Sequence, residues 1–174
     1  MNTNRPPDFP TLYRCEFSYV WKTLRRLGVP ARDLEDLAHD VFVVVHRHIA
    51  DYDPARPVRP WLFGIAFRVV ADFRRAARNR CEIPSDVGDA VDAAPSADAQ
   101  LQESEARAVL MNALDGLDMD RRAVFVMHEL DGMAAPEIAL ALAVPLNTVY
   151  SRLRLARADV AASIRRFRAK EPGP

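Results

Sequence analysis

Hydrogen-bonding and cationic side chains are concentrated between residues 147 and 157, at spacings that suit contact with DNA. Arginine can pair with guanine through two hydrogen bonds, and serine and asparagine bond to base edges or phosphates. A helix N-terminus also attracts phosphate. The side chains predicted to contact DNA in this stretch are Asn147, Thr148, Tyr150, Ser151, Arg152, Arg154 and Arg157.

Two helices joined by a tight turn would present these side chains. Pro136 suits the first turn of a short helix, residues 143–145 read as a turn, and Asn147 and Thr148 are expected to cap the helix that follows. This is the layout of a helix-turn-helix, whose second helix enters the major groove. An antiparallel helix pair with a solvated basic face would have the same spacing, so spacing alone leaves both interpretations open.

A second group of residues places aromatic rings beside cations in the first half of the chain. Proteins hold unstacked bases on such rings, at about 1–3 kcal/mol per stacked base. Trp61 follows Pro60 at a predicted helix start and is the better candidate for a base platform, whereas Phe63 and Phe67 lie at helical spacing that is typical of a core. The residues predicted to face unpaired DNA are Tyr52, Arg59, Trp61, Arg68 and Arg75.

Four acids occupy the front half of an apolar helical stripe that runs from Leu34 to Ile49. Carboxylates are favourable near a helix N-terminus, and an acidic helix face is often merely solvated. The pattern is therefore compatible with a solvated face or with a surface that binds a basic partner. The four acids are Asp33, Glu35, Asp36 and Asp40.

Enzyme chemistry has little support in the sequence. His39 and His46 are seven residues apart with Asp40 nearby, but two histidines and one carboxylate make an incomplete metal site. Cys15 and Cys81 lack C-x-x-C spacing, although a redox role for either thiol stays open. No glycine-rich phosphate loop or nucleophile motif occurs. We expect no catalytic residue, no metal and no cofactor.

The charges are unevenly distributed along the 174 residues, although 24 Lys and Arg balance 24 Asp and Glu. Seven acids and no Lys or Arg lie between Glu82 and Glu105, which leaves 24 basic against 17 acidic residues elsewhere. The same stretch is rich in Pro, Gly, Ala and Ser and cannot bury enough apolar surface to offset its ordering entropy. We predict a flexible acidic linker, with a surface loop inside one domain as the alternative.

Apolar residues recur at three- and four-residue steps on both sides of this stretch, without the alternation of period two that marks strands. The pattern predicts an all-α fold of two small helical domains. Prolines predict a break between helices at 50–60. The predicted divisions are an N-terminal tail at 1–8, a first domain at 9–80, the linker at 81–103 and a second domain at 104–171.

Membrane insertion is not expected, because no apolar run approaches the roughly 18–20 residues needed to span a bilayer. The first eight residues contain no apolar signal region. A content of 49% apolar and 28% charged residues is ordinary for a globular protein. We expect a soluble protein of the cell interior.

Three motifs occur in order along the chain: DLEDLAHDVF at 33–42, WLFGIA at 61–66, and EIA at 137–139 with TVYSRL at 148–153 and AR at 156–157. Together they resemble a sigma factor of bacterial RNA polymerase, of the compact extracytoplasmic-function (ECF) group that keeps only the second and fourth sigma regions. The resemblance covers both lobes but not the tail or the linker. It implies a cytoplasmic, nucleoid-associated protein that initiates transcription without catalysing a reaction.

The resemblance also implies roles for each group of residues. The acidic helix would dock on basic clamp helices of the largest polymerase subunit, and the second domain would reach the flap region. The loop at 51–60 with Trp61 would receive flipped bases of the −10 element, and the helix from Asn147 would read the −35 element. An anti-sigma factor is an expected partner. A helix-turn-helix regulator that acts as a dimer without polymerase is the alternative function.

Several positions depart from the pattern of the family. Gly64 stands where arginine is usual, and Arg68 stands where asparagine usually faces the melted strand. Base selection near −10 is therefore expected to be unusual. The departures in the second domain are Pro136, Asn147, Tyr150 and Leu155.

Overall fold

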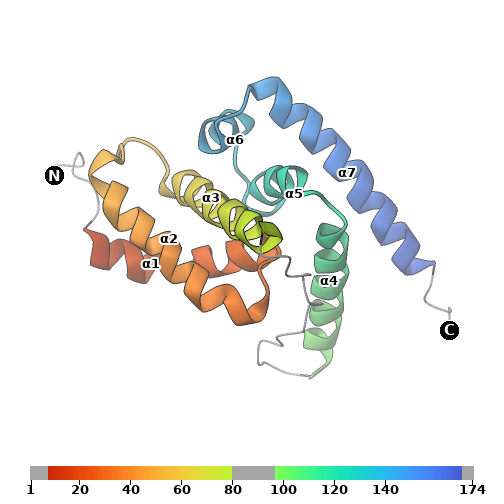
Figure 1. Cartoon of the computed structure of the whole chain (residues 1–174). Helices are drawn as coiled ribbons and strands as arrows, with labels where there is room; N and C mark the ends of the chain where they lie inside the picture. Colours follow the sequence, from red (N-terminus) through yellow and green to blue (C-terminus); the bar gives the residue numbers. More distant parts are fainter. Residues whose placement is uncertain (1–7, 80–96, 170–174) are drawn as a thin grey trace. The chain divides into compact units, whose positions relative to one another are not determined.

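The computed structural model of the chain describes residues 8–79 and 97–169, together with the side chains of 8–79 and 106–169. Over these residues the structure is helical without a strand, which confirms the predicted all-α fold (Figure 1). The described residues form two compact units: residues 8–79 together with Leu140–Ala143, and residues 97–139 together with residues 144–169. Within the described ranges, no helix combines the length and apolar character needed to cross a membrane.

The first unit contains three helices joined by short 3-10 turns. They are α1 (Phe9–Arg26), η1 (Ala31–Asp33), α2 (Leu34–His48), η2 (Ile49–Asp51) and α3 (Val58–Asn79). Each of the three helices packs against the other two. Leu24, Val41 and Phe63 are fully buried where they meet, and burying an apolar side chain of this size contributes about 1.5–3 kcal/mol. This core fixes the orientation of α2, whose outer side carries the acids.

The ends of α1 follow from its capping residues. Asp8 precedes the helix and accepts a hydrogen bond from the Thr11 N–H at 3.2 Å; bonding from the side chain and backbone of Thr11 lowers the pKa of the Asp8 carboxyl. After the helix, Gly28 has a φ of +81°, which glycine adopts without a Cβ clash. The Val29 N–H then bonds to the Leu24 carbonyl at 3.1 Å, as in a Schellman motif.

The start of α3 differs from the prediction. A break was expected through residue 60, but the helix begins at Val58 and includes Pro60 in its first turn. The N–H groups of a first turn have no acceptor within the helix, so the missing N–H of proline costs nothing there. Trp61 therefore lies inside the first turn of α3 rather than at its start.

The second unit is also helical. It contains α4 (Ala97–Asp115), α5 (Met119–Phe125), the π-helical turn η3 (Val126–Leu130), residues 135–139 of α6 (Ala135–Leu142) and α7 (Leu146–Arg168). Helix α7 packs against α4 and α5. Leu114, Val124 and Met127 are fully buried in this unit. These contacts bury one side of α7 and leave residues on its opposite side exposed.

The predicted linker at 81–103 is wrong over its last seven residues, because α4 already begins at Ala97. Residues 97–103 have the sequence ADAQLQE, which contains strong helix formers and neither proline nor glycine. The linker was predicted from the composition of the whole stretch, which does not reveal the helix propensity of these seven residues. The rest of the predicted linker lies outside the described residues.

A tight turn joins α6 to α7, as the sequence predicts for a helix-turn-helix. Ala143 has a φ of +54°, a left-handed conformation that reverses the chain. Pro145 precedes the first residue of α7, and no side chain caps the helix. The predicted capping by Asn147 and Thr148 is wrong, since both lie within the first turn of α7.

Candidate nucleic-acid and protein interfaces

Helix α2 separates an apolar inner side from an acidic outer side. Leu37 and Val41 are buried against the other helices of the first unit. The side chains that the sequence predicts for docking lie on the opposite side, where Glu35, Asp36 and Asp40 are exposed and Asp33 is half-buried. The structure therefore brings the four predicted acids to one end of α2.

The four acids differ in their partners. Asp33 pairs with Arg32 at 3.4 Å. Among the described side chains, Glu35, Asp36 and Asp40 form no ion pair. Their negative charges face solvent without internal compensation, which leaves them available to a cationic surface of another molecule.

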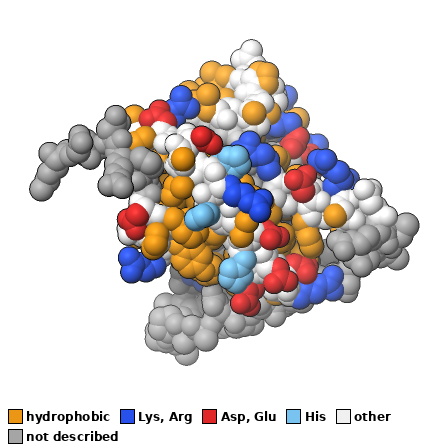
Figure 2. All heavy atoms as spheres, turned by 60° about the vertical axis from the view of Figure 1, so that its left-hand side comes forward, with side chains coloured by type: hydrophobic (Ala, Val, Ile, Leu, Met, Phe, Trp, Pro, Cys, Tyr) orange, Lys and Arg blue, Asp and Glu red, His pale blue; other side chains and the backbone are white. Residues whose placement is uncertain are grey.

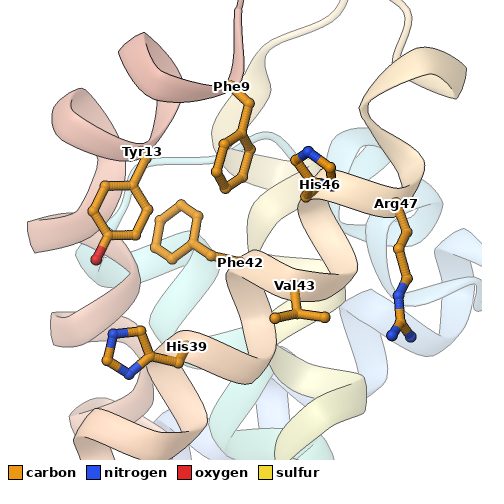
Figure 3. A pocket seen from close by; sticks show the side chains of 7 residues that line it. All are labelled: Phe9, Tyr13, His39, Phe42, Val43, His46 and Arg47. Atoms are coloured by element: carbon orange, nitrogen blue, oxygen red, sulfur yellow. The ribbon is translucent and has the colours of Figure 1, made fainter.

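An open hollow of about 310 Å³ lies beside these acids, between α1 and α2. Phe9 and Tyr13 approach it from α1, and Phe42 and Val43 approach from α2 (Figure 3). The space-filling view of this side of the molecule shows hydrophobic side chains gathered next to histidines (Figure 2). The remaining lining residues are His39, His46 and Arg47.

Two histidines of α2, His39 and His46, line this hollow. The ring of His46 lies 4.8 Å from the ring of Phe9, edge to face. Across the described residues, no group of three His, Cys, Asp or Glu side chains is placed to hold a metal ion. Cys15 is a free, exposed thiol on α1. Among the described residues, His39 and His46 belong to no such group.

Tyr52, predicted to face DNA, is instead a support of the loop before α3. Its side chain is only 9% exposed, its hydroxyl donates to the Arg56 carbonyl, and its ring lies 4.9 Å from the ring of Trp61. Burial, with a smaller effect of the Asp53 charge, raises the pKa of the Tyr52 phenol. The Ala55 N–H also bonds to Asp53 at 3.0 Å, so the loop is shaped from within.

Arg59 is held by side chains of α1. Its Nε lies 3.1 Å from a carboxylate oxygen of Glu16, and its guanidinium lies 5.0 Å from the centre of the Tyr19 ring. These two contacts fix the direction of the arginine at the start of α3. Sequence reasoning missed Glu16 and Tyr19, because no local pattern relates α1 to a residue about 40 positions later.

The other three residues predicted to face unpaired DNA lie along α3. Trp61 is half-buried against Tyr52, and Arg68 is exposed. Arg75 is exposed and lies 3.5 Å from Asp72 on the same helix. The structure thus brings Trp61 next to the loop, places Arg59 one turn or less away, and distributes Arg68 and Arg75 further along α3.

The side chains of α7 divide into a buried stripe and an outward face. Val149, Leu153, Ala156 and Val160 are buried. With 3.6 residues per turn, positions 147, 151, 154 and 158 lie opposite this stripe, and Asn147, Ser151 and Arg154 are exposed. Tyr150 is 54% exposed at the edge of that face. Four of the seven predicted DNA contacts are therefore presented to solvent on one side.

Arg152 does not belong to this outward face. It lies on the flank of α7 that meets α5, where its guanidinium pairs with Asp120. The next contact on the same flank joins Arg121 of α5 to Asp159 of α7 at 2.7 Å. On the opposite flank, Arg157 pairs with Glu129 of η3 at 2.6 Å. Two predicted DNA contacts are thus engaged with carboxylates of preceding elements.

Thr148 completes the predicted set, and its carbonyl accepts a hydrogen bond from the Ser151 hydroxyl at 3.0 Å. Sequence reasoning missed the two carboxylates that hold Arg152 and Arg157. Asp120 and Glu129 lie 32 and 28 residues before their partners, beyond the reach of a helical pattern. Only their charge, opposite to that of the arginines, was visible in the sequence.

Family models match both units. The model described as "Sigma-70 region 2" matches residues 12–80, and the model described as "Sigma-70, region 4" matches residues 107–160. The RNA polymerase sigma factor CnrH of Cupriavidus metallidurans is 33% identical over 147 residues, which are 79% of this chain and 76% of CnrH. The ECF RNA polymerase sigma factor SigE of Mycolicibacterium smegmatis is 31% identical over 153 residues, which are 87% of this chain and 59% of SigE.

Solved structures of similar fold include two complexes. CnrH in complex with the cytosolic domain of CnrY matches with a TM-score of 0.63 and 26% identity, covering 94% of this chain and 89% of that one. The sigma factor RpoE in complex with the anti-sigma factor NepR, from Bartonella quintana, matches with a TM-score of 0.72 and 18% identity. That match covers 91% of this chain and 97% of RpoE and shows a shared fold.

Proposed function

The chain belongs to the ECF group of the sigma-70 family, and we propose that its two units bring core RNA polymerase to promoters whose −10 and −35 elements they read. The observation that carries the proposal is the presence of both sigma regions in one chain, in order, at 12–80 and 107–160. A regulator that acts through its helix-turn-helix alone would not need the first unit. The protein is thus a transcription initiation factor.

The first unit is proposed to dock on the clamp helices of the largest polymerase subunit through Asp33, Glu35, Asp36 and Asp40. The support is electrostatic. Three of these carboxylates are exposed and form no ion pair among the described side chains, so a basic partner gains attraction without first breaking internal pairs. Opposite charges across an interface raise association rates and favour the correct partner.

The loop before α3 is proposed to receive unpaired bases of the −10 element. Trp61 offers a half-buried ring, and aromatic rings stack on bases of any sequence. The ring of Tyr52 packs against this ring, with 4.9 Å between the ring centres. Arg59, Arg68 and Arg75 supply positive charge along the same helix for the phosphates of the melted strand.

The second unit is proposed to read the −35 element as double-stranded DNA through α7. Its outward face presents Asn147, Ser151 and Arg154, with Tyr150 at the edge. Thr148 lies in the first turn, where free N–H groups favour a phosphate. Arg152 and Arg157 lie on the flanks, in ion pairs.

Further partners and the place of action follow from the same proposal. The second unit is proposed to contact the flap region of polymerase, and the whole chain to work in the bacterial cytoplasm at the nucleoid, where promoter DNA lies. The sigma factor RpoE binds the anti-sigma factor NepR in its solved complex, which supports an anti-sigma partner for this chain. The chemical steps of transcription are assigned to polymerase, and this chain is assigned no catalytic residue.

Run-off transcription tests the proposal. Core polymerase of a bacterium is incubated with and without the protein on a DNA library that is randomised at the −35 and −10 positions, and the transcripts are sequenced. We expect the protein to enrich transcripts from templates with defined sequences at both positions. Promoter-specific binding at physiological salt by the protein alone, with no enrichment when polymerase is added, would instead identify a polymerase-independent regulator.

A further inference from the structure

We propose that Arg152 and Asp120 are a positioning pair, which sets the rotation of α7 about its own axis and leaves base reading to the outward side chains. The inference rests on the proposed function, because it concerns how this helix is presented to the −35 element. It also changes the role predicted for Arg152, whose residue type suits guanine recognition. Positioning residues act through the side chains that they orient.

The buried stripe of α7 turns one side of the helix toward the core and so sets its rotation broadly. Val149, Leu153 and Val160 are aliphatic, and their burial is favourable in any direction that removes apolar surface from water. Such contacts are not directional, so they define the rotation only to within the width of the stripe. Hydrogen-bonded ion pairs are directional, because the planar guanidinium of arginine donates along fixed directions. Pairs at the edges of the stripe can therefore select one rotation.

Arg152 is placed at such an edge. Its guanidinium contacts the Oδ2 of Asp120, in the first turn of α5. The side chain of Arg152 is only 24% exposed, whereas that of Arg157 on the other flank is 55% exposed. Arg152 is thus the more enclosed of the two, and leaving Asp120 would separate two charges that are partly removed from solvent.

A second pair of reversed polarity supports the same flank. Arg121 of α5 lies 2.7 Å from Asp159 of α7. Arg152 and Asp159 are seven residues apart, or about 10.5 Å along a helix. Helix α5 therefore contacts α7 through ion pairs at two points along its length. Asp118 fixes this end of α5, because it accepts a hydrogen bond from the Arg121 N–H at 2.9 Å and pairs with the Arg121 guanidinium at 2.5 Å.

The opposite flank is closed by Glu129 of η3. One oxygen of this carboxylate accepts from the Nε of Arg157 at 2.8 Å and lies 2.6 Å from its Nη2. The buried stripe therefore has an ion pair on either side, and a roll of α7 in either direction stretches one of them. The outward face, with Ser151 and Arg154, is held in a single orientation.

This orientation matters for recognition because base edges are read at hydrogen-bond distance. A donor beyond about 3.5 Å makes no bond, and each base pair presents its groups at fixed places in the major groove. Loss of the positioning pair is therefore expected to weaken every contact of α7 together. Loss of a base-reading side chain is expected to remove discrimination at one position.

The experiment uses the full chain with bacterial core polymerase and the library of templates randomised at −35 and −10. The variants are Asp120→Ala, Arg152→Ala, both together, and the exchange of the two charges, Asp120→Arg with Arg152→Asp. Each single alanine variant is expected to reduce initiation from the templates preferred by the wild type about fivefold, without altering the base preferences. The double alanine variant is expected to be no worse, and the charge exchange to recover initiation to within about twofold of the wild type.

The matched control is Arg154→Ala, an arginine of the outward face two residues away. This variant is expected to flatten the base preference at one −35 position. Arg152→Lys keeps a cation for Asp120 but not the fixed donor directions of the guanidinium. It is expected to lose less initiation than Arg152→Ala, which provides a second test if the charge-exchange variant does not fold. Circular dichroism melting separates loss of the fold from loss of recognition.

Two results would overturn the positioning role. In the first, Arg152→Ala flattens the base preference at a single −35 position, and Asp120→Ala leaves initiation unchanged or raises it. The other is a loss in Arg152→Lys equal to that in Arg152→Ala. If the wild type enriches no template at all, the proposed function itself fails, and this outcome is distinct because it appears before any variant is compared.

Discussion

Helices α2 and α7 both carry charged residues opposite a buried apolar stripe, but they treat those charges differently. On α2, Glu35, Asp36 and Asp40 face solvent with no ion pair among the described side chains. On α7, Arg152, Arg157 and Asp159 are each paired with a residue of α5 or η3. The unpaired charges of α2 are suited to meeting another molecule, whereas the paired charges of α7 orient that helix.

The difference separates two kinds of functional residue that look alike in a sequence. Arginines at a predicted DNA-reading helix suggest contact with DNA in every case. Among the described side chains, however, Arg152 and Arg157 form ion pairs and Arg154 does not. The carboxylates of α2 could have been paired in the same manner, but among the described side chains they form no ion pair. The role of a charged side chain on these two helices therefore depends on whether another side chain of the protein pairs with it.

The largest expected effect is the loss of stability when a buried side chain of α2 or α7 is truncated. The two helices are expected to respond alike, because each buries an apolar stripe. Leu37→Ala on α2 and Leu153→Ala on α7 each truncate a side chain that is 4% exposed. Each is expected to lower the free energy of unfolding of its unit by about 2–5 kcal/mol, through lost burial and the cavity left behind. Urea titration followed by circular dichroism measures the loss. A loss under about 1 kcal/mol at either position would show that the stripe is not a core there.

The next effect concerns binding through α2. Replacing Asp36 and Asp40 together with alanine is expected to weaken binding to core polymerase about tenfold, since two uncompensated charges are lost from the docking surface. Stability should fall by no more than about 1 kcal/mol, the scale of an acid near a helix N-terminus. Fluorescence anisotropy of labelled protein measures the affinity.

Asp72→Ala is the matched control for the docking surface, because this exposed carboxylate lies on α3 and pairs with Arg75. It is expected to leave the affinity for polymerase unchanged. Equal losses in the control and the double variant would mean that overall negative charge, rather than the face of α2, determines binding.

A smaller effect tests whether the loop of the first unit is held from within, as α7 is. Tyr52→Phe removes the hydroxyl that donates to the Arg56 carbonyl and is expected to cost about 1 kcal/mol of stability. Because burial raises the pKa of Tyr52 in the folded state, the unfolded chain loses this proton first. Stability should therefore be intact below about pH 10 and fall above it.

Thermal unfolding of the wild type and of Tyr52→Phe between pH 8 and 11 checks this dependence. The variant is expected to lose the part of the alkaline decline that belongs to Tyr52. An identical decline in both proteins would show that the phenol titrates as it does in the unfolded chain.

The smallest effect compares single charges on the two helices. Asp159→Asn breaks a partly exposed pair with Arg121 and is expected to lower stability by about 0.2–1 kcal/mol. Asp40→Asn, on the unpaired face of α2, is expected to change stability by less than about 0.5 kcal/mol. The difference should shrink at 1 M salt, where charges beyond about 3 Å are screened. A larger loss at Asp40 would show that this acid has an internal partner.

The sequence determined the helices and their stripes, because periodicity is a local property of the chain. The turn at Ala143 and the buried side of α2 are both found where the sequence placed them. The sequence did not predict two helix starts correctly, because proline content and acidic composition were taken as signs of irregular structure. Pro60 lies inside α3, and α4 starts at Ala97. Those errors concern single turns and leave the architecture unchanged.

The tertiary structure alone decided which charged and aromatic residues are available. Tyr52 became buried because the loop folds over it, and Arg152 became a flank residue because Asp120 lies across from it on α5. The contacts of Tyr52 and Arg152 depend on how the chain packs, and the hydrophobic periodicity of the sequence does not predict them. Residue type determined what each side chain could bind, and packing decided whether it is free to do so.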